Sequence, residues 1–152
     1  MLKICIAVEN TVGEIYECFA SMFPEQQDFW KNMAAEEQGH ARQFVVASSL
    51  KGSAALPPSM QLAQNCLDAA RKTKRDVLEN PRLSLEDAFQ IAIGLEQTTV
   101  EDFLERMIQD ESDSELKGFY GSLLIDGRHH AEFLRKRLAG IRHGGNQTKT
   151  GN

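Results

Sequence analysis

The sequence is poor in cysteine and has none of the spacings that define thiolate centres. Its three cysteines are Cys5, Cys18 and Cys66, an odd number without a Cys-x-x-Cys pair. This pattern fits neither a disulfide framework nor a tetrathiolate zinc or iron centre. We therefore expect buried, reduced thiols in a cytoplasmic protein.

Long apolar runs and an excess of basic residues are also missing. No stretch reaches the ~18 apolar residues that a membrane-spanning helix needs, and the first residues lack the basic region and apolar core of a signal peptide. A net charge of −5 argues against a nucleic-acid surface. We expect a protein that binds neither membrane nor nucleic acid, and 152 residues suffice for one domain with a real core.

Signals for β-structure are nearly absent. No segment shows sustained alternation of apolar and polar residues, and the single Asp-Gly pair, Asp126-Gly127, lies inside a helical pattern. Apolar residues instead recur at helical spacings, as Ile6, Val12, Ile15 and Phe19 do. The sequence therefore predicts an all-α fold.

Turn residues and capping signals divide this pattern into helices. Gly52 and the Pro57-Pro58 pair mark a linker over 51–59, Asn80-Pro81 marks a break, and Ser84 with Asp87 forms a capping box. The expected helices span about 2–22, 24–50, 59–78 and 84–109, and a last one begins at Ser112 or Ser114 and ends near 142. They leave a polar tail at 144–152. We expect one bundle domain over 1–143 and a flexible tail over 144–152.

The lengths of the connections predict how these helices pack. Short connections make 2–22 and 24–50 antiparallel neighbours, and likewise 84–109 and the last helix. The longer connection between the two pairs carries the shorter helix 59–78. The sequence predicts a four-helix bundle with one long crossover that carries a short extra helix.

One motif interrupts the apolar stripe of the second helix. Glu37 and His40 lie three residues apart, so they share one helix face with Met33 and Phe44. That face is expected to be buried, where a carboxylate must be paired, neutralised or bound to a metal. An exposed pair is the default interpretation of one such motif alone.

A second copy of the motif favours a metal site. Asp126 and His129 repeat the carboxylate-x-x-His spacing, and Phe133 follows His129 as Phe44 follows His40. Each copy also has a glutamate on the preceding long helix, because Glu9 precedes Glu37 and Glu96 precedes Asp126 at nearly equal separations. The match indicates an internal duplication.

Turn geometry selects Glu9 among the acids of the first helix. Pro24, at the turn, is almost equally far along the chain from Glu9 and from Glu37, so both carboxylates reach the same height in an antiparallel pair. Glu14 and Glu17 would lie one or two turns too close to the loop. Two glutamate helices and two carboxylate-x-x-His helices are the elements of a ferritin-like di-metal site.

Four segments carry a resemblance to a known family. AVENTVGEIYECFA, MAAEEQGHARQF, IGLEQTTVEDF and LLIDGRHHAEFL resemble, in order, the four helical motifs of the rubrerythrin branch of the ferritin-like superfamily. The resemblance covers about residues 4–138. It implies a metal-ligand set of Glu9, Glu37, His40, Glu96, Asp126 and His129.

The ligand set implied by the resemblance suits hard-to-borderline ions. Four carboxylates and two imidazoles favour two iron ions, with manganese or zinc as other occupants, because two divalent cations neutralise four negative charges. By the resemblance we expect reduction of peroxide or dioxygen at a di-iron centre. With no Cys-x-x-Cys pair, electrons would come from an external donor such as a rubredoxin-like protein. A homodimer is the expected assembly.

Two departures from the family pattern keep other functions open. Asp126 stands where the resemblance implies a glutamate, and no acid lies at 97–100 after Glu96, where a further carboxylate is usual. Iron oxidation for storage and a metal-binding bundle without catalysis are the alternatives.

Two individual roles also stay open. His130 competes with His129, because His130 precedes Ala131 as His40 precedes Ala41. Tyr16 lies seven residues after Glu9, as Phe103 does after Glu96. It either acts at the site, by hydrogen-bonding a metal-bound carboxylate or relaying an electron, or packs as a core tyrosine bonded to any neighbour.

Overall fold

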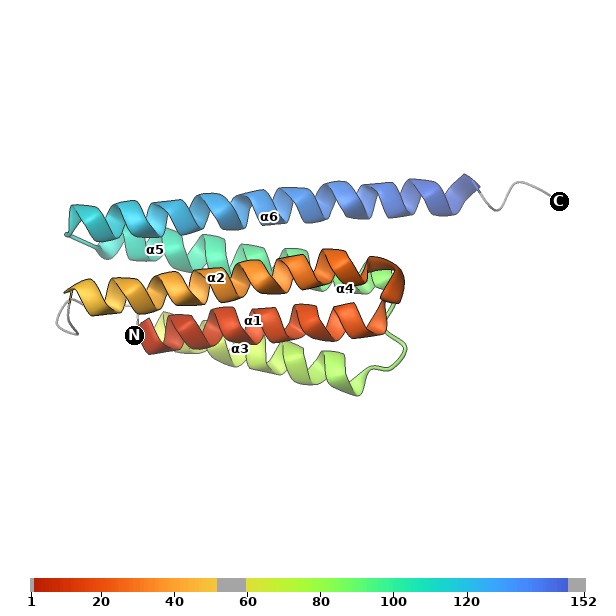
Figure 1. Ribbon diagram of the computed structural model, residues 1–152, viewed down its shortest axis with the longest axis horizontal. Helices are drawn as coiled ribbons and strands as arrows, with labels where there is room; N and C mark the ends of the chain where they lie inside the picture. Colours follow the sequence, from red (N-terminus) through yellow and green to blue (C-terminus); the bar gives the residue numbers. More distant parts are fainter. Residues whose placement is uncertain (1, 52–59, 148–152) are drawn as a thin grey trace.

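The computed structural model describes residues 2–51 and 60–147, and its regular elements are all helices (Figure 1). No strand occurs within these two ranges, so the all-α prediction is confirmed. The elements are α1 (Leu2–Met22), the 3-10 turn η1 (Pro24–Gln26), α2 (Gln27–Lys51), α3 (Met60–Glu79), α4 (Leu85–Leu95), the π-helical segment η2 (Glu96–Glu101), α5 (Asp102–Asp110) and α6 (Ser114–Gln147).

The helices form two antiparallel pairs, as the connection lengths predict. α1 packs along α2, and α6 packs along the continuous α4–η2–α5 helix. The crossover helix α3 lies on the outer side of α1 and has 20 residues, nearly the 21 of α1. Most of the predicted linker 51–59 lies outside the described residues.

The start of α4 confirms the predicted capping box. The Ser84 hydroxyl accepts a hydrogen bond from the Asp87 amide, and the Asp87 carboxylate accepts one from the Ser84 amide. These bonds satisfy two backbone donors at the helix end, which stabilises the first turn.

The helix predicted over 84–109 contains a wider turn that the periodicity does not predict. Residues 96–101 form a π-helical segment, in which each turn holds one more residue than an α-turn. Thr98 and its neighbours Thr99 and Val100 are β-branched and have low helix propensity. Segments of this kind frequently occur at functional sites, and Glu96 is its first residue.

The last helix extends further than the sequence indicates. α6 continues to Gln147, five residues beyond the expected end at Arg142, and crosses the Gly144-Gly145 pair. Glycine costs ~1 kcal/mol in a helix interior but does not forbid the helix. The rest of the predicted tail, 148–152, lies outside the described residues.

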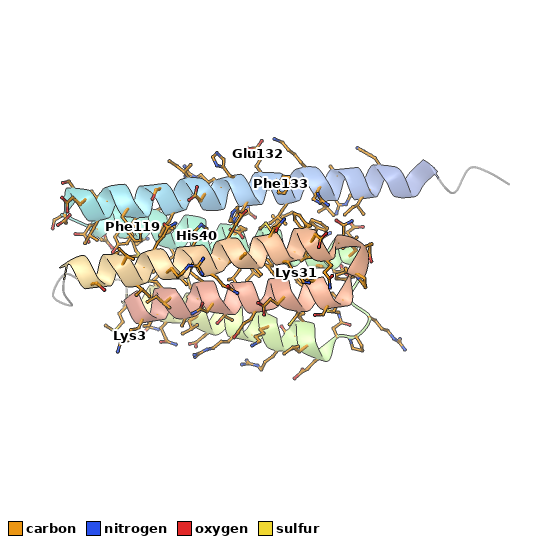
Figure 2. All side chains as sticks on the ribbon, viewed as in Figure 1. Lys3, Lys31, His40, Phe119, Glu132 and Phe133 are labelled. Carbon is orange, nitrogen blue, oxygen red and sulfur yellow. The ribbon has the colours of Figure 1, made fainter. Side chains whose placement is uncertain are left out.

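The core lies between the two helix pairs. Aromatic rings gather near the α1–α2 turn, where Trp30 contacts Tyr16, Phe19, Phe29 and Phe89 at centroid distances between 4.7 and 5.8 Å. Charged residues such as Lys3 and Glu132 lie on the outside (Figure 2). In the described ranges, every helix is too short or too polar to cross a membrane.

Candidate metal centre

Five ionisable side chains meet in the interior between the two helix pairs. They come from four helices and are only 1% to 9% exposed: Glu9 of α1, Glu37 and His40 of α2, Glu96 at the start of η2, and His130 of α6. Isolated buried charges are costly, so such a cluster needs internal pairing or a bound ion.

The cluster divides into two groups that have one member in common. Glu9, Glu37 and His40 each offer one ligand atom within 4.8 Å of the other two, and Glu37, Glu96 and His130 do the same. Glu37 belongs to both groups. One of its carboxylate oxygens lies on the side of His40 and the other on the side of His130. This arrangement suits two neighbouring cations bridged by Glu37.

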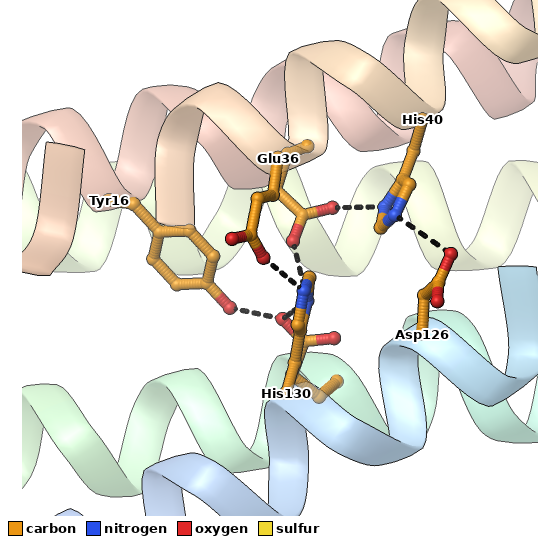
Figure 3. A network of polar contacts seen from close by, with 7 residues as sticks. Tyr16, Glu36, His40, Asp126 and His130 are labelled. Carbon is orange, nitrogen blue, oxygen red and sulfur yellow. Dashed lines mark hydrogen bonds and ion pairs between the residues drawn. The ribbon is translucent and has the colours of Figure 1, made fainter. Parts of the chain in front are cut away.

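Both imidazoles turn their Nδ1 atoms toward Glu37 (Figure 3). His40 Nδ1 lies 3.2 Å from Glu37 Oε2. His130 Nδ1 lies 3.3 Å from Glu37 Oε1 and 3.7 Å from Glu96 Oε1. The inward ring nitrogens are thus the atoms placed to bind a cation.

Three buried atoms of the cluster make no hydrogen bond to any described residue. These atoms are Glu37 Oε1, Glu96 Oε2 and His130 Nδ1. The 3.3 Å approach of His130 to Glu37 is within ion-pair distance but is not aligned as a hydrogen bond. Buried polar atoms are rarely left in this state unless a water or an ion satisfies them, so the donor set fits bound cations.

The outward ring nitrogens meet carboxylates of the opposite helix. His130 Nε2 of α6 lies 2.5 Å from Glu36 Oε2 of α2, and His40 Nε2 of α2 lies 3.9 Å from Asp126 Oδ2 of α6. Glu36 and Asp126 are both about half exposed. A carboxylate on the outer nitrogen fixes the orientation of a metal-binding imidazole and raises its basicity.

The protein's own charges leave the cluster unevenly balanced. Burial raises the pKa of Glu37, but contacts with His130 and His40 outweigh burial and lower it to about 2. Burial and the charge of Glu37 raise the pKa of Glu96 to about 7 and that of Glu9 well above its usual range. Glu37 therefore holds the negative charge, while Glu9 and Glu96 tend to keep protons.

His130 carries the balancing positive charge. Burial lowers its pKa, but contacts with Glu37 and Glu96 raise it to about 11. A proton on Nδ1 faces the same oxygens that would bind a cation. A bound metal would replace that proton, because a ligating imidazole must be neutral.

Tyr16 connects the first helix pair to the second. Its hydroxyl donates a 2.6 Å hydrogen bond to Glu96 Oε1, and its ring is fully buried against Trp30. Burial raises the pKa of Tyr16 well above its usual range, so the hydroxyl keeps its proton. The hydroxyl thus contacts one of the carboxylates that the resemblance implies as metal ligands.

The structure brings together four of the six predicted ligands and places the other two outside the cluster. Glu9, Glu37, His40 and Glu96 lie in the cluster, but His129 is exposed and His130 occupies the inward position. Asp126 is 49% exposed and contacts the outer nitrogen of His40 instead of facing the interior. The structure therefore places His130, and not His129, in the cluster, and it makes Asp126 an outer contact of His40.

Helix geometry explains why His130 faces inward and His129 does not. One residue turns an α-helix by about 100°, so His129 and His130 cannot share a face. The buried residues of α6 include Leu123, Leu134 and Leu138, which place His130 on the inner face. Phe133, the expected counterpart of Phe44, is 49% exposed, and the buried counterpart is Leu134.

Sequence reasoning missed Glu36, whose signal is its spacing. Glu36 lies four residues before His40, as Asp126 lies four residues before His130. A polar groove of about 430 Å³ between α2 and α6 exposes both outer carboxylates and reaches both cluster imidazoles. The groove therefore connects solvent with the outer sides of both imidazoles.

A comparison with protein families matches residues 1–138 to the rubrerythrin model. The chain belongs to the rubrerythrin family. No curated protein and no solved structure matches the chain. Family membership agrees with the resemblance of the four motifs and with the ferritin-like bundle.

Among the described residues, the cluster of this rubrerythrin chain has three inward carboxylates, one fewer than the ligand set that the resemblance implies. Glu9, Glu37 and Glu96 carry at most three negative charges against the four positive charges of two divalent cations. The oxygen and imidazole donors suit iron, manganese or zinc. The buried carboxylate and histidine groups could thus hold a metal.

Proposed function

We propose that this protein binds two iron ions and reduces peroxide or dioxygen with electrons from an external donor. The observation that carries the proposal is the pair of ligand groups that share Glu37. Glu9, Glu37 and His40 would hold one ion, and Glu37, Glu96 and His130 the other. Two ferrous ions together supply the two electrons that reduction of peroxide to water requires.

The protein's own residues would prepare the site for this chemistry. Glu36 orients His130 through Nε2, and Tyr16 holds Glu96 through a hydrogen bond from its hydroxyl. Aromatic packing around Trp30 keeps one side of the site dry, while the groove between α2 and α6 admits substrate and protons.

The cellular setting is part of the proposal. The three free thiols agree with a reducing cytoplasm, and burial raises the pKa of Cys5 to about 12, which keeps that thiol protonated. A rubredoxin-like protein is the kind of donor that would supply single electrons, and the homodimer stays a prediction.

One observation favours iron oxidation as a second candidate. Glu36 and Asp126 place two exposed carboxylates at the groove that leads to the cluster. Acidic residues at such an opening attract ferrous ions from solvent. In that case ferrous iron would be consumed as substrate, and no reductase partner would be needed for turnover.

Iron loading without oxygen tests the proposal. We expect two irons per chain, oxidation of both by one equivalent of peroxide, and repeated turnover only with an added one-electron donor. Glu37→Gln should lose iron, whereas Glu79→Gln, the same change at the exposed end of α3, should retain it. One iron or none, or no optical response to peroxide, would contradict the proposal. Turnover driven by ferrous iron alone would favour iron oxidation.

A further inference from the structure

α2 and α6 repeat one pattern of buried positions at a constant offset along the chain. The matched pairs are Met33 and Leu123, Ala34 and Leu124, His40 and His130, Ala41 and Ala131, and Phe44 and Leu134, and all ten residues are buried. The outer carboxylates follow the same offset, because Glu36 and Asp126 each face the imidazole of the opposite helix.

The repeat fails at one inward position. The counterpart of Glu37 is Gly127, which is buried three residues before His130, as Glu37 is three residues before His40. Asp126 does not replace the missing group, because its side chain is 49% exposed and contacts His40 Nε2. α6 therefore contributes an imidazole to the cluster but no inward carboxylate.

The missing side chain leaves positions on the cations unfilled. Each ligand group comprises only three residues, whereas divalent iron, manganese or cobalt usually takes four to six ligands. Three carboxylates against two divalent cations also leave a positive charge of one. A small anion would complete both the coordination and the charge.

The groove between α2 and α6 lies next to this position, because Asp126, which precedes Gly127, is one of its lining residues. It is lined by residues of both helices, among them His40 and His130, whose inward nitrogens face the ligand groups. Its volume of about 430 Å³ accommodates a one- or two-carbon carboxylate.

We infer that the metal-loaded protein binds a small monocarboxylate, of the size of formate or acetate, in place of the side chain that Gly127 lacks. Its two oxygens would serve as the second bridge between the cations, opposite Glu37. The inference rests on the proposed binding of two cations.

Titration with Co²⁺ tests this binding, with formate as the probe. We expect formate to raise the affinity of the wild-type protein for the second Co²⁺ by about tenfold or more. The carbon-13 relaxation of formate should be faster with the Co²⁺-loaded wild-type protein than with the same concentration of free Co²⁺. Gly127→Glu should bind two Co²⁺ tightly without formate and lose the formate dependence.

A matched variant separates bridging from added charge. Gly121→Glu makes the same change on α6, where a Cβ meets no atom within 4 Å, and should keep the formate dependence of the wild type. Formate-independent binding of two Co²⁺ by the wild type, or formate relaxation equal to that in free Co²⁺, would overturn the inference alone. Failure of the wild type to bind Co²⁺ with or without formate would overturn the metal centre itself.

Discussion

The two helix pairs contribute unequally to the cluster. α1 and α2 bring two inward carboxylates and one imidazole, whereas η2 and α6 bring one carboxylate and one imidazole. The outer contacts differ too, since Glu36 lies 2.5 Å from His130 but Asp126 lies 3.9 Å from His40. The two helix pairs repeat one pattern, but both of their ligand groups depend on the single residue Glu37.

The largest expected effect comes from removing that shared residue. Glu37→Gln should weaken binding of both cations by about 100-fold or more. It should also lower the free energy of unfolding of the metal-free protein by about 3 kcal/mol, because two imidazoles lose their buried partner. Metal titration and denaturant unfolding check both effects. Loss of only one cation would contradict the shared role of Glu37.

The second prediction concerns Glu96, whose replacement should raise the free energy of unfolding of the metal-free protein, whereas replacement of Glu37 should lower it. A raised pKa means that the folded state loses stability as the pH rises from the usual glutamate value of 4.5 to the folded pKa of about 7. Glu96→Gln removes this loss, so it should stabilise the metal-free protein increasingly over that range. The gain should then level off at about 3 kcal/mol. Unfolding curves at several pH values measure it, and a constant or negative difference would contradict the assignment.

Variants of the outer carboxylates test whether the contacts with the outer nitrogens of His130 and His40 contribute unequally to cation binding. Glu36→Gln should weaken binding of the cation held by His130 by about tenfold. Asp126→Asn should have a smaller effect on the cation held by His40, because the contact is longer. Calorimetric titration of both variants with Co²⁺ compares them directly. Equal losses would show that distance does not set the strength of this support.

The smallest expected effect concerns the contact that joins the halves. Tyr16→Phe should cost about 1 kcal/mol of metal-free stability, because Glu96 loses its buried hydrogen-bond donor. Tyr120→Phe, the same change at another buried tyrosine, is the matched control for binding, and only Tyr16→Phe should weaken cation binding. Unchanged cation affinity in Tyr16→Phe would remove this tyrosine from the site.

The helices and the positions of Glu9, Glu37 and His40 can be predicted from the sequence. Both depend on spacings within a helix or across a tight turn. The distances of Glu9 and Glu37 from Pro24 along the chain place both at one height. The second half depends on which residue of the His129-His130 pair faces inward. Leu134 and Leu138 mark that face, but Phe133 is the more conspicuous apolar residue.

The π-helical segment is not predictable from the apolar pattern. Its wider turns begin at Glu96, so the residues of α4 and those of α5 do not continue one α-helical face. Matching the two halves by sequence assumes unbroken α-helices. That assumption still finds Glu96, since it lies at the start of the segment.

The measurement that tests the account most directly is anomalous X-ray scattering from crystals loaded with Mn²⁺. We predict two peaks on either side of Glu37, one with Glu9 and His40 and the other with Glu96 and His130. His129 should lie outside both coordination shells. A single peak at Asp126 and His129, or none in the interior, would contradict the shared-carboxylate centre.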